Sequence, residues 1–139
     1  MRRFVVPMLW VIACDGSSAP PESAAPRAAI PMLVEVGREE YVRSCATCHG
    51  ADARGAETPA GNRAPDLTQI AARRGGDFPA DEIGDWIDGR LAPAAHGSRE
   101  MPIWGSRFAR GLPPEPLTQD LVRGRIVTLV EYLRSIQVE

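Results

Sequence analysis

The chain has 139 residues, with 16 basic side chains against 18 acidic ones and a formal net charge of −2. Every basic residue is an arginine, yet the overall balance is slightly acidic. Proteins that bind nucleic acid usually carry a basic surface, so this composition argues against nucleic acid as a partner.

The N-terminus has the pattern of an export signal. Arg2 and Arg3 precede an apolar run from Phe4 to Ala13, which is too short to span a bilayer as a mature helix. The four residues that end at Cys14, Val11-Ile12-Ala13-Cys14, resemble a bacterial lipoprotein cleavage box, with valine in place of the commoner leucine. We therefore expect a signal peptide at 1–13 and a lipid on Cys14. The alternatives are an ordinary secretory signal cut near Ala19, which would give a soluble periplasmic protein, or an uncleaved anchor.

Residues 14–33 are rich in alanine, proline and serine. Such a segment cannot bury a core, so it predicts a semi-rigid tether rather than folded structure. The remaining segment, 34–139, suits one small domain whose core would be marginal without a bound group. Removing Arg2 and Arg3 with the signal leaves 14 basic against 18 acidic side chains, a net charge of about −4.

A first helix is predicted from about Val34 to Cys48, and it leads into the sequence Cys45-Ala46-Thr47-Cys48-His49. The pattern C-x-x-C-H is typical of covalent haem attachment. Two cysteines three residues apart share one helix face, so each thiol can form a thioether with one haem vinyl group, while His49 supplies an axial ligand to the iron. A thiol redox pair or half of a zinc site are the alternatives, but no second C-x-x-C pair completes a zinc site.

Further helices are predicted after the motif. Short ones are expected at 66–72 after Pro65 and at 80–88 after Pro79. A longer C-terminal helix, with Thr118 and Asp120 near its start, carries an apolar stripe: Val122, Ile126, Leu129, Val130, Leu133 and Ile136. Because no segment shows strand alternation, the expected class is all-α.

Together these residues resemble class I monohaem cytochromes c over nearly all of 34–139. Gly37 and Tyr41 stand where that family has a glycine and an aromatic on its first helix, and Leu129 and Tyr132 fit its last helix. The resemblance implies a cytochrome c fold of three to five helices around one covalent haem c, with the terminal helices crossing at the glycine.

The resemblance also implies the remaining site residues. The segment Glu100-Met101-Pro102-Ile103-Trp104-Gly105 is similar to the family's methionine loop, which makes Met101 the second axial ligand. His96 is the rival ligand, and core packing is the alternative role for Met101. Pro65 stands where the family has the proline whose carbonyl accepts the Nδ1 proton of the ligand histidine. The longer loop from Ala51 to Arg63 makes this part of the comparison less direct.

The sequence offers several candidates for the other haem contacts. The aromatic residues Phe78, Trp86, Trp104 and Phe108 either line the haem or pack in the core, and the arginines that could pair with haem propionates are Arg63, Arg90, Arg99 and Arg107. With both axial positions filled, the expected function is one-electron transfer to and from redox partner proteins, with no small-molecule substrate. The alternatives are a haem-based sensor or ligand-binding module, or the cytochrome subunit of a larger oxidoreductase. The expected location is the periplasmic side of a bacterial membrane.

Overall fold

The computed structural model describes residues 31–90 and 101–138. Within these ranges it contains no named strand, and Glu57 and Arg63 form one isolated bridge. The helices are α1 (Pro31–Ser44), α2 (Ala46–His49), α3 (Ala80–Asp88), α4 (Trp104–Phe108) and α5 (Leu117–Ser135), with two 3-10 turns at Leu67–Gln69 and Ala72–Arg74. The predicted all-α class is confirmed. In the described ranges, no helix combines the length and the apolar character needed to cross a bilayer.

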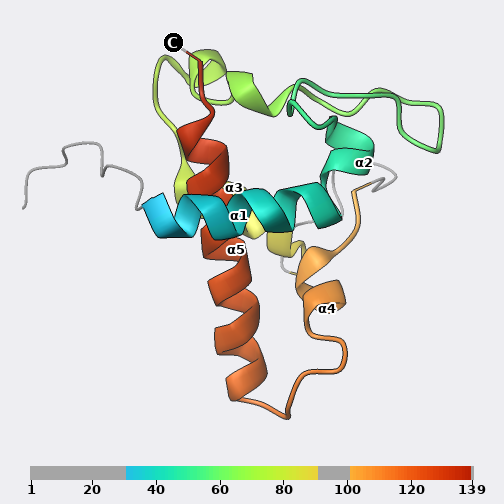
Figure 1. Ribbon diagram of the computed structural model, residues 1–139, viewed down its shortest axis with the longest axis vertical. Coiled ribbons are helices and arrows are strands. Elements are labelled where there is room, and N and C mark those ends of the chain that lie inside the picture. Colours follow the sequence, from blue (N-terminus) through green and yellow to red (C-terminus); the bar gives the residue numbers. More distant parts are fainter. Residues whose placement is uncertain (1–30, 91–100, 139) are drawn as a thin grey trace, which may run out of the picture.

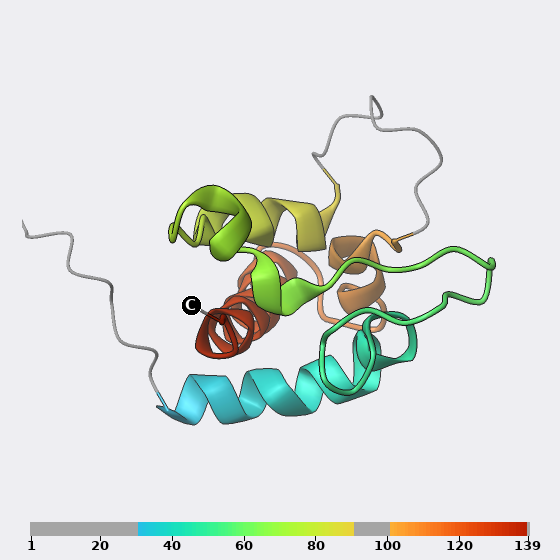
Figure 2. The same cartoon turned by 90° about the horizontal axis from the view of Figure 1, so that it is seen from above.

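Helices α1 and α5 lie across each other, as Figure 1 shows and as the view from above in Figure 2 also shows. They form the most extensive contact between helices in the described chain. Gly37 lies at the crossing, against the backbone of Thr128. One turn further along each helix, the rings of Tyr41 and Tyr132 pack with centroids 5.1 Å apart. The crossing of the terminal helices is therefore present, at the glycine that the family resemblance indicated.

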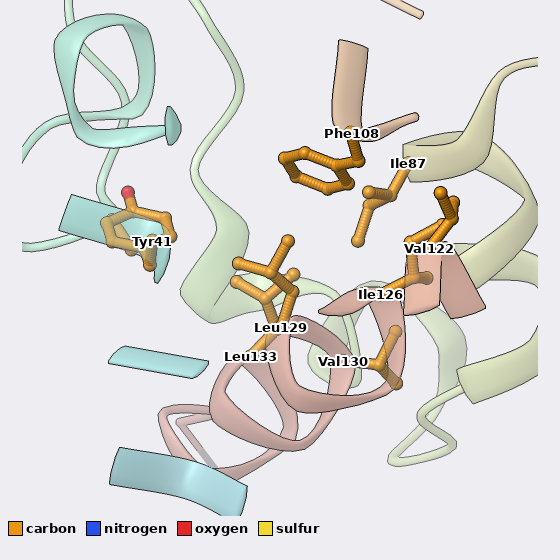
Figure 3. Close-up of a cluster of buried hydrophobic side chains, with 9 residues drawn as sticks. Tyr41, Ile87, Phe108, Val122, Ile126, Leu129, Val130 and Leu133 are labelled. Atoms are coloured by element: carbon orange, nitrogen blue, oxygen red, sulfur yellow. The ribbon is translucent and has the colours of Figure 1, made fainter. Parts of the chain in front are cut away.

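The core is built on the apolar stripe of α5. Val122, Ile126, Leu129, Val130 and Leu133 are all buried, as their spacing predicted. Figure 3 shows Ile87 of α3 and Phe108 of α4 next to these side chains, with Tyr41 of α1 on the opposite side of the cluster. The core thus joins all the longer helices, and Cys45 and Ala46, which follow α1, pack against it.

The element boundaries correct several expectations. The first helix ends at Ser44 instead of continuing to Cys48, and it begins at Pro31, inside the segment assigned to the tether. The helix expected at 66–72 is replaced by the two 3-10 turns, the first of which is capped by the Asp66 carboxylate accepting from the Thr68 amide. Helix α3 has the predicted bounds. Helix α4 was not predicted.

Candidate functional site

The C-x-x-C-H motif lies at a break between two helices. Cys45 is a turn residue between α1 and α2, with φ −114°, and its carbonyl oxygen accepts from the His49 amide at 3.0 Å. Both Cys45 and Cys48 are free thiols of intermediate exposure, and His49 is buried. The break therefore places two available thiols and one buried imidazole in a single turn of chain.

The imidazole of His49 is held by a backbone carbonyl. Its Nδ1 lies 3.1 Å from the carbonyl oxygen of Pro65, the contact that the family resemblance implies. When Nδ1 donates to this oxygen, Nε2 is left unprotonated and able to bind a metal. The side chain is thus held in a way that would suit it to bind iron through Nε2.

Gly55 brings Pro65 to the histidine. The Gly55 amide donates to the His49 carbonyl oxygen at 2.8 Å, which folds the loop back onto α2. A Cβ placed on Gly55 would lie 2.2 Å from the Ala64 carbonyl oxygen, and the residue has φ +82°, so both space and backbone conformation require glycine. Gly55 could not be singled out from the sequence, because nothing in the loop's several glycines shows which one is tightly packed.

The rest of the loop is anchored on either side of this contact. The hydroxyl of Tyr41 donates to the Gly50 carbonyl oxygen at 2.7 Å. Ala53 is completely buried at φ +60°, and its carbonyl oxygen accepts from the Leu67 amide at 2.8 Å. The longer loop from Ala51 to Arg63 contains a turn closed by the bridge between Glu57 and Arg63. This loop leaves the contact between His49 and Pro65 in place.

The electrostatics of Cys45 differ from those of a redox dithiol. Burial, assisted by the nearby charges of Glu40 and Cys48, raises the pKa of the Cys45 thiol to about 12. Catalytic cysteines of thiol oxidoreductases have lowered pKa values, because the thiolate is the reactive form. The environment of Cys45 therefore disfavours the thiol redox pair.

Met101 packs against the hydrophobic core. It is half-buried and packs against the same hydrophobic cluster that Cys45 borders. Trp104, at the start of α4, also packs there, with its ring centroid 5.4 Å from that of Phe108. The structure thus brings the methionine segment to the core that contacts the C-x-x-C-H motif.

The other candidates for haem contacts differ in their exposure and in their partners. Phe108 is buried, Phe78 and Trp104 are half-buried, and Trp86 is exposed. Arg90 is paired with Asp88, Arg107 stacks on Trp104, and Arg63 is exposed. The candidate residues Cys14, His96 and Arg99 lie outside the described ranges.

Comparison with known families agrees with this geometry. The family model described as Cytochrome c matches residues 34–137, which is most of the chain. The chain therefore belongs to the cytochrome c family. The searches of curated proteins and of solved structures each found no match.

Membership of this family implies covalent haem c, and the residues present fit that group. Two free thiols are available for the two thioether bonds, and a buried histidine has its Nδ1 engaged by Pro65. The chain is accordingly a haem-binding protein with an electron-carrier role. Its partners are redox proteins.

Proposed function

We propose that the chain carries single electrons with a haem iron ligated by His49 and Met101, and that a lipid on Cys14 tethers it to the exported side of a bacterial membrane. The hydrogen-bond geometry between His49 Nδ1 and the Pro65 carbonyl, at 3.1 Å, is the observation that carries the proposal. It supports iron ligation by His49, because a carbonyl that accepts from Nδ1 orients the ring and leaves Nε2 free.

Each residue has a separate part in this function. Cys45 and Cys48 would bind the haem covalently, His49 and Met101 would ligate its iron, and Pro65 orients His49. The haem supplies a reversible one-electron iron couple, whose potential is raised by methionine ligation relative to two histidines. Since both axial positions are taken by the protein, no place is left for a substrate to bind the iron.

The surface beside Met101 supports brief contacts with partners. Ile103 is 40% exposed two residues after Met101, and Thr47 is exposed between the two cysteines. Electron-transfer complexes usually have small, short-lived interfaces, for which a few exposed side chains near the cofactor suffice. A lipid tether would keep the domain close to membrane-bound donors and acceptors.

The decisive experiment is an optical spectrum of the oxidised holoprotein, combined with a reductive titration. A methionine-to-iron charge-transfer band at the red end of the visible spectrum, with a reversible one-electron couple, is the result expected of the carrier. A high-spin spectrum would contradict it and favour the haem sensor. A low-spin spectrum without the methionine band would move the second ligand to His96.

A further inference from the structure

The far end of α4 is covered by an ion pair that joins α1 and α5. Arg125 of α5 donates to both oxygens of the Glu40 carboxylate, at 3.0 and 2.9 Å from its terminal nitrogen and at 3.2 Å from Nε. The Glu40 side chain is only 5% exposed. The guanidinium carbon of Arg125 also lies 4.1 Å from the centre of the Phe108 ring, and Phe108 is the last residue of α4.

The first turn of α4 is covered by a second ion pair. A Cβ on Gly105 would lie 2.3 Å from Asp88 Oδ1 and 2.6 Å from Arg90 Nε, so these two side chains occupy the space next to that glycine. Arg90 donates to Asp88 at 2.6 Å and to the Gln119 side chain of α5 at 2.9 Å. Charged groups from α1, α3 and α5 therefore hold α4 at both ends.

Met101 is closely coupled to α4. Only Pro102 and Ile103 separate it from Trp104, where the helix begins. The Ile103 carbonyl accepts from the Arg107 amide at 3.1 Å, and Pro102 has a fixed φ. Because so few free torsions lie between them, a shift of α4 must move Met101 as well.

The Glu40 carboxylate is buried although the Arg125 side chain is 42% exposed, and a buried charge is an unexpected choice for stability alone. Removing a charge from water costs much of what its attraction to a partner returns, so an apolar side chain of similar volume often stabilises a core equally well. A guanidinium that forks onto a carboxylate does, however, fix one geometry among its neighbours. This property suits a contact whose task is to set the position of α4.

We propose that Glu40 and Arg125 are positioning residues for the axial methionine: by clamping Phe108, they keep α4 docked and hold Met101 on the iron. The inference rests on the proposed His49 and Met101 ligation. Breaking the pair increases the fraction of molecules in which the methionine has left the iron. An external ligand then binds more tightly in proportion to that fraction.

The test is an imidazole titration of the oxidised holoprotein, followed by its absorption. Arg125→Met keeps a long side chain but removes the guanidinium, and it should lower the apparent Kd for imidazole by about tenfold, the effect of losing a charged hydrogen bond of moderate strength. The methionine-to-iron band should weaken in parallel. Arg125→Lys, which keeps the charge without the fork, should restore part of the change.

Arg134→Met is the matched control. Arg134 is also on α5, where its guanidinium carbon lies 5.1 Å from the centre of the Phe78 ring and its Nε pairs with Glu131. The substitution therefore removes a similar contact, but one that does not involve α4. It should leave imidazole affinity at the wild-type value even where urea unfolding shows a loss of stability. Glu40→Gln provides a second, milder variant and should act in the same direction as Arg125→Met.

Two negative results have different meanings. Wild-type imidazole affinity in both Arg125→Met and Glu40→Gln, with an unchanged methionine band, would overturn the positioning role and leave a purely structural ion pair. A wild type that lacks the band and binds imidazole as readily as Met101→Ala would instead show that the ligand assignment itself is wrong. That result would also disprove the positioning role of Glu40 and Arg125.

Discussion

Gly37 of α1 lies directly against the carbonyl group of Thr128 of α5: a Cβ on Gly37 would stand 1.9 Å from that oxygen and 2.6 Å from its carbon. The two backbones therefore touch, which no residue with a side chain would permit. Since α1 leads straight into the C-x-x-C-H turn, this contact also fixes where the haem-attachment residues lie relative to the core.

Gly37→Ala should destabilise the folded protein by about 3 kcal/mol or more, because the added methyl meets backbone rather than a flexible side chain. Urea unfolding followed by far-UV circular dichroism measures the change. Gly124→Ala is the matched control, since it is also helical but has nothing within 4 Å of its added Cβ. It should stabilise the helix by up to about 1 kcal/mol. Similar losses in both variants would contradict the close-contact explanation.

The long helices could be predicted from the sequence because their information is local. The stripe of α5 gave both the helix and its buried face, and α3 was predicted with its observed bounds. The stop at Ser44 was not predicted, since the spacing of Cys45 and Cys48 also fits a continuous helix.

The parts that escaped prediction depend on tertiary contacts. Helix α4 has five residues and includes a glycine, so it shows no helical periodicity and is held by Phe108 packing and by the Asp88 and Arg90 pair. Within the site, the motif was evident from spacing and Pro65 came from family resemblance. The roles of Gly55 and of the ion pair between Glu40 and Arg125 could be recognised only from the folded structure.

Haem attachment should need the two cysteines as well as His49. Each cysteine supplies one thioether, so Cys45→Ala or Cys48→Ala should weaken retention, and the double variant should lose haem to acid–acetone extraction. Absorption of the extracted and residual fractions gives the answer. A double variant that keeps its haem through extraction would disprove covalent attachment at these positions.

Met101→Ala should open the iron to external ligands while leaving the haem covalently attached. Without the thioether, the apparent Kd for imidazole should fall by at least about tenfold, because the competing internal ligand is gone. The reduction potential should fall as well, as methionine favours the reduced iron. Imidazole and potentiometric titrations of both proteins test this. Equal affinity in the two would assign the sixth position to His96 or leave it open.

Stability in acid should depend on Glu40. Burial acts to raise the pKa of this carboxyl, but hydrogen bonds from Ser44, Arg125 and Arg43 outweigh burial and hold the pKa below its usual value of 4.5. Ionised Glu40 therefore contributes stability at pH values above 4.5, and the contribution is lost as pH falls through the folded-state pKa.

Glu40→Gln should cost about 1–2 kcal/mol of unfolding free energy at neutral pH, with a smaller difference from wild type in acid. Urea unfolding at a series of pH values measures both. Glu35→Gln serves as the control, because Glu35 pairs with Arg38 on the exposed side of the same helix and should change little at any pH. A Glu40→Gln deficit that stays constant into acid would contradict the linkage.

If Cys14 carries a lipid, the mature chain begins there and is held to a membrane on the exported side, where haem attachment also occurs. Two or more acyl chains make a stable anchor, because each buried methylene adds about 0.8 kcal/mol. Cys14→Ser should then block lipidation and processing, whereas a conventional cleavable signal in its place should yield a soluble holoprotein with an unchanged spectrum. Membrane fractionation and intact mass decide the matter: a soluble, unmodified wild-type protein that starts downstream of Cys14 would show that the chain is cut as an ordinary secretory protein.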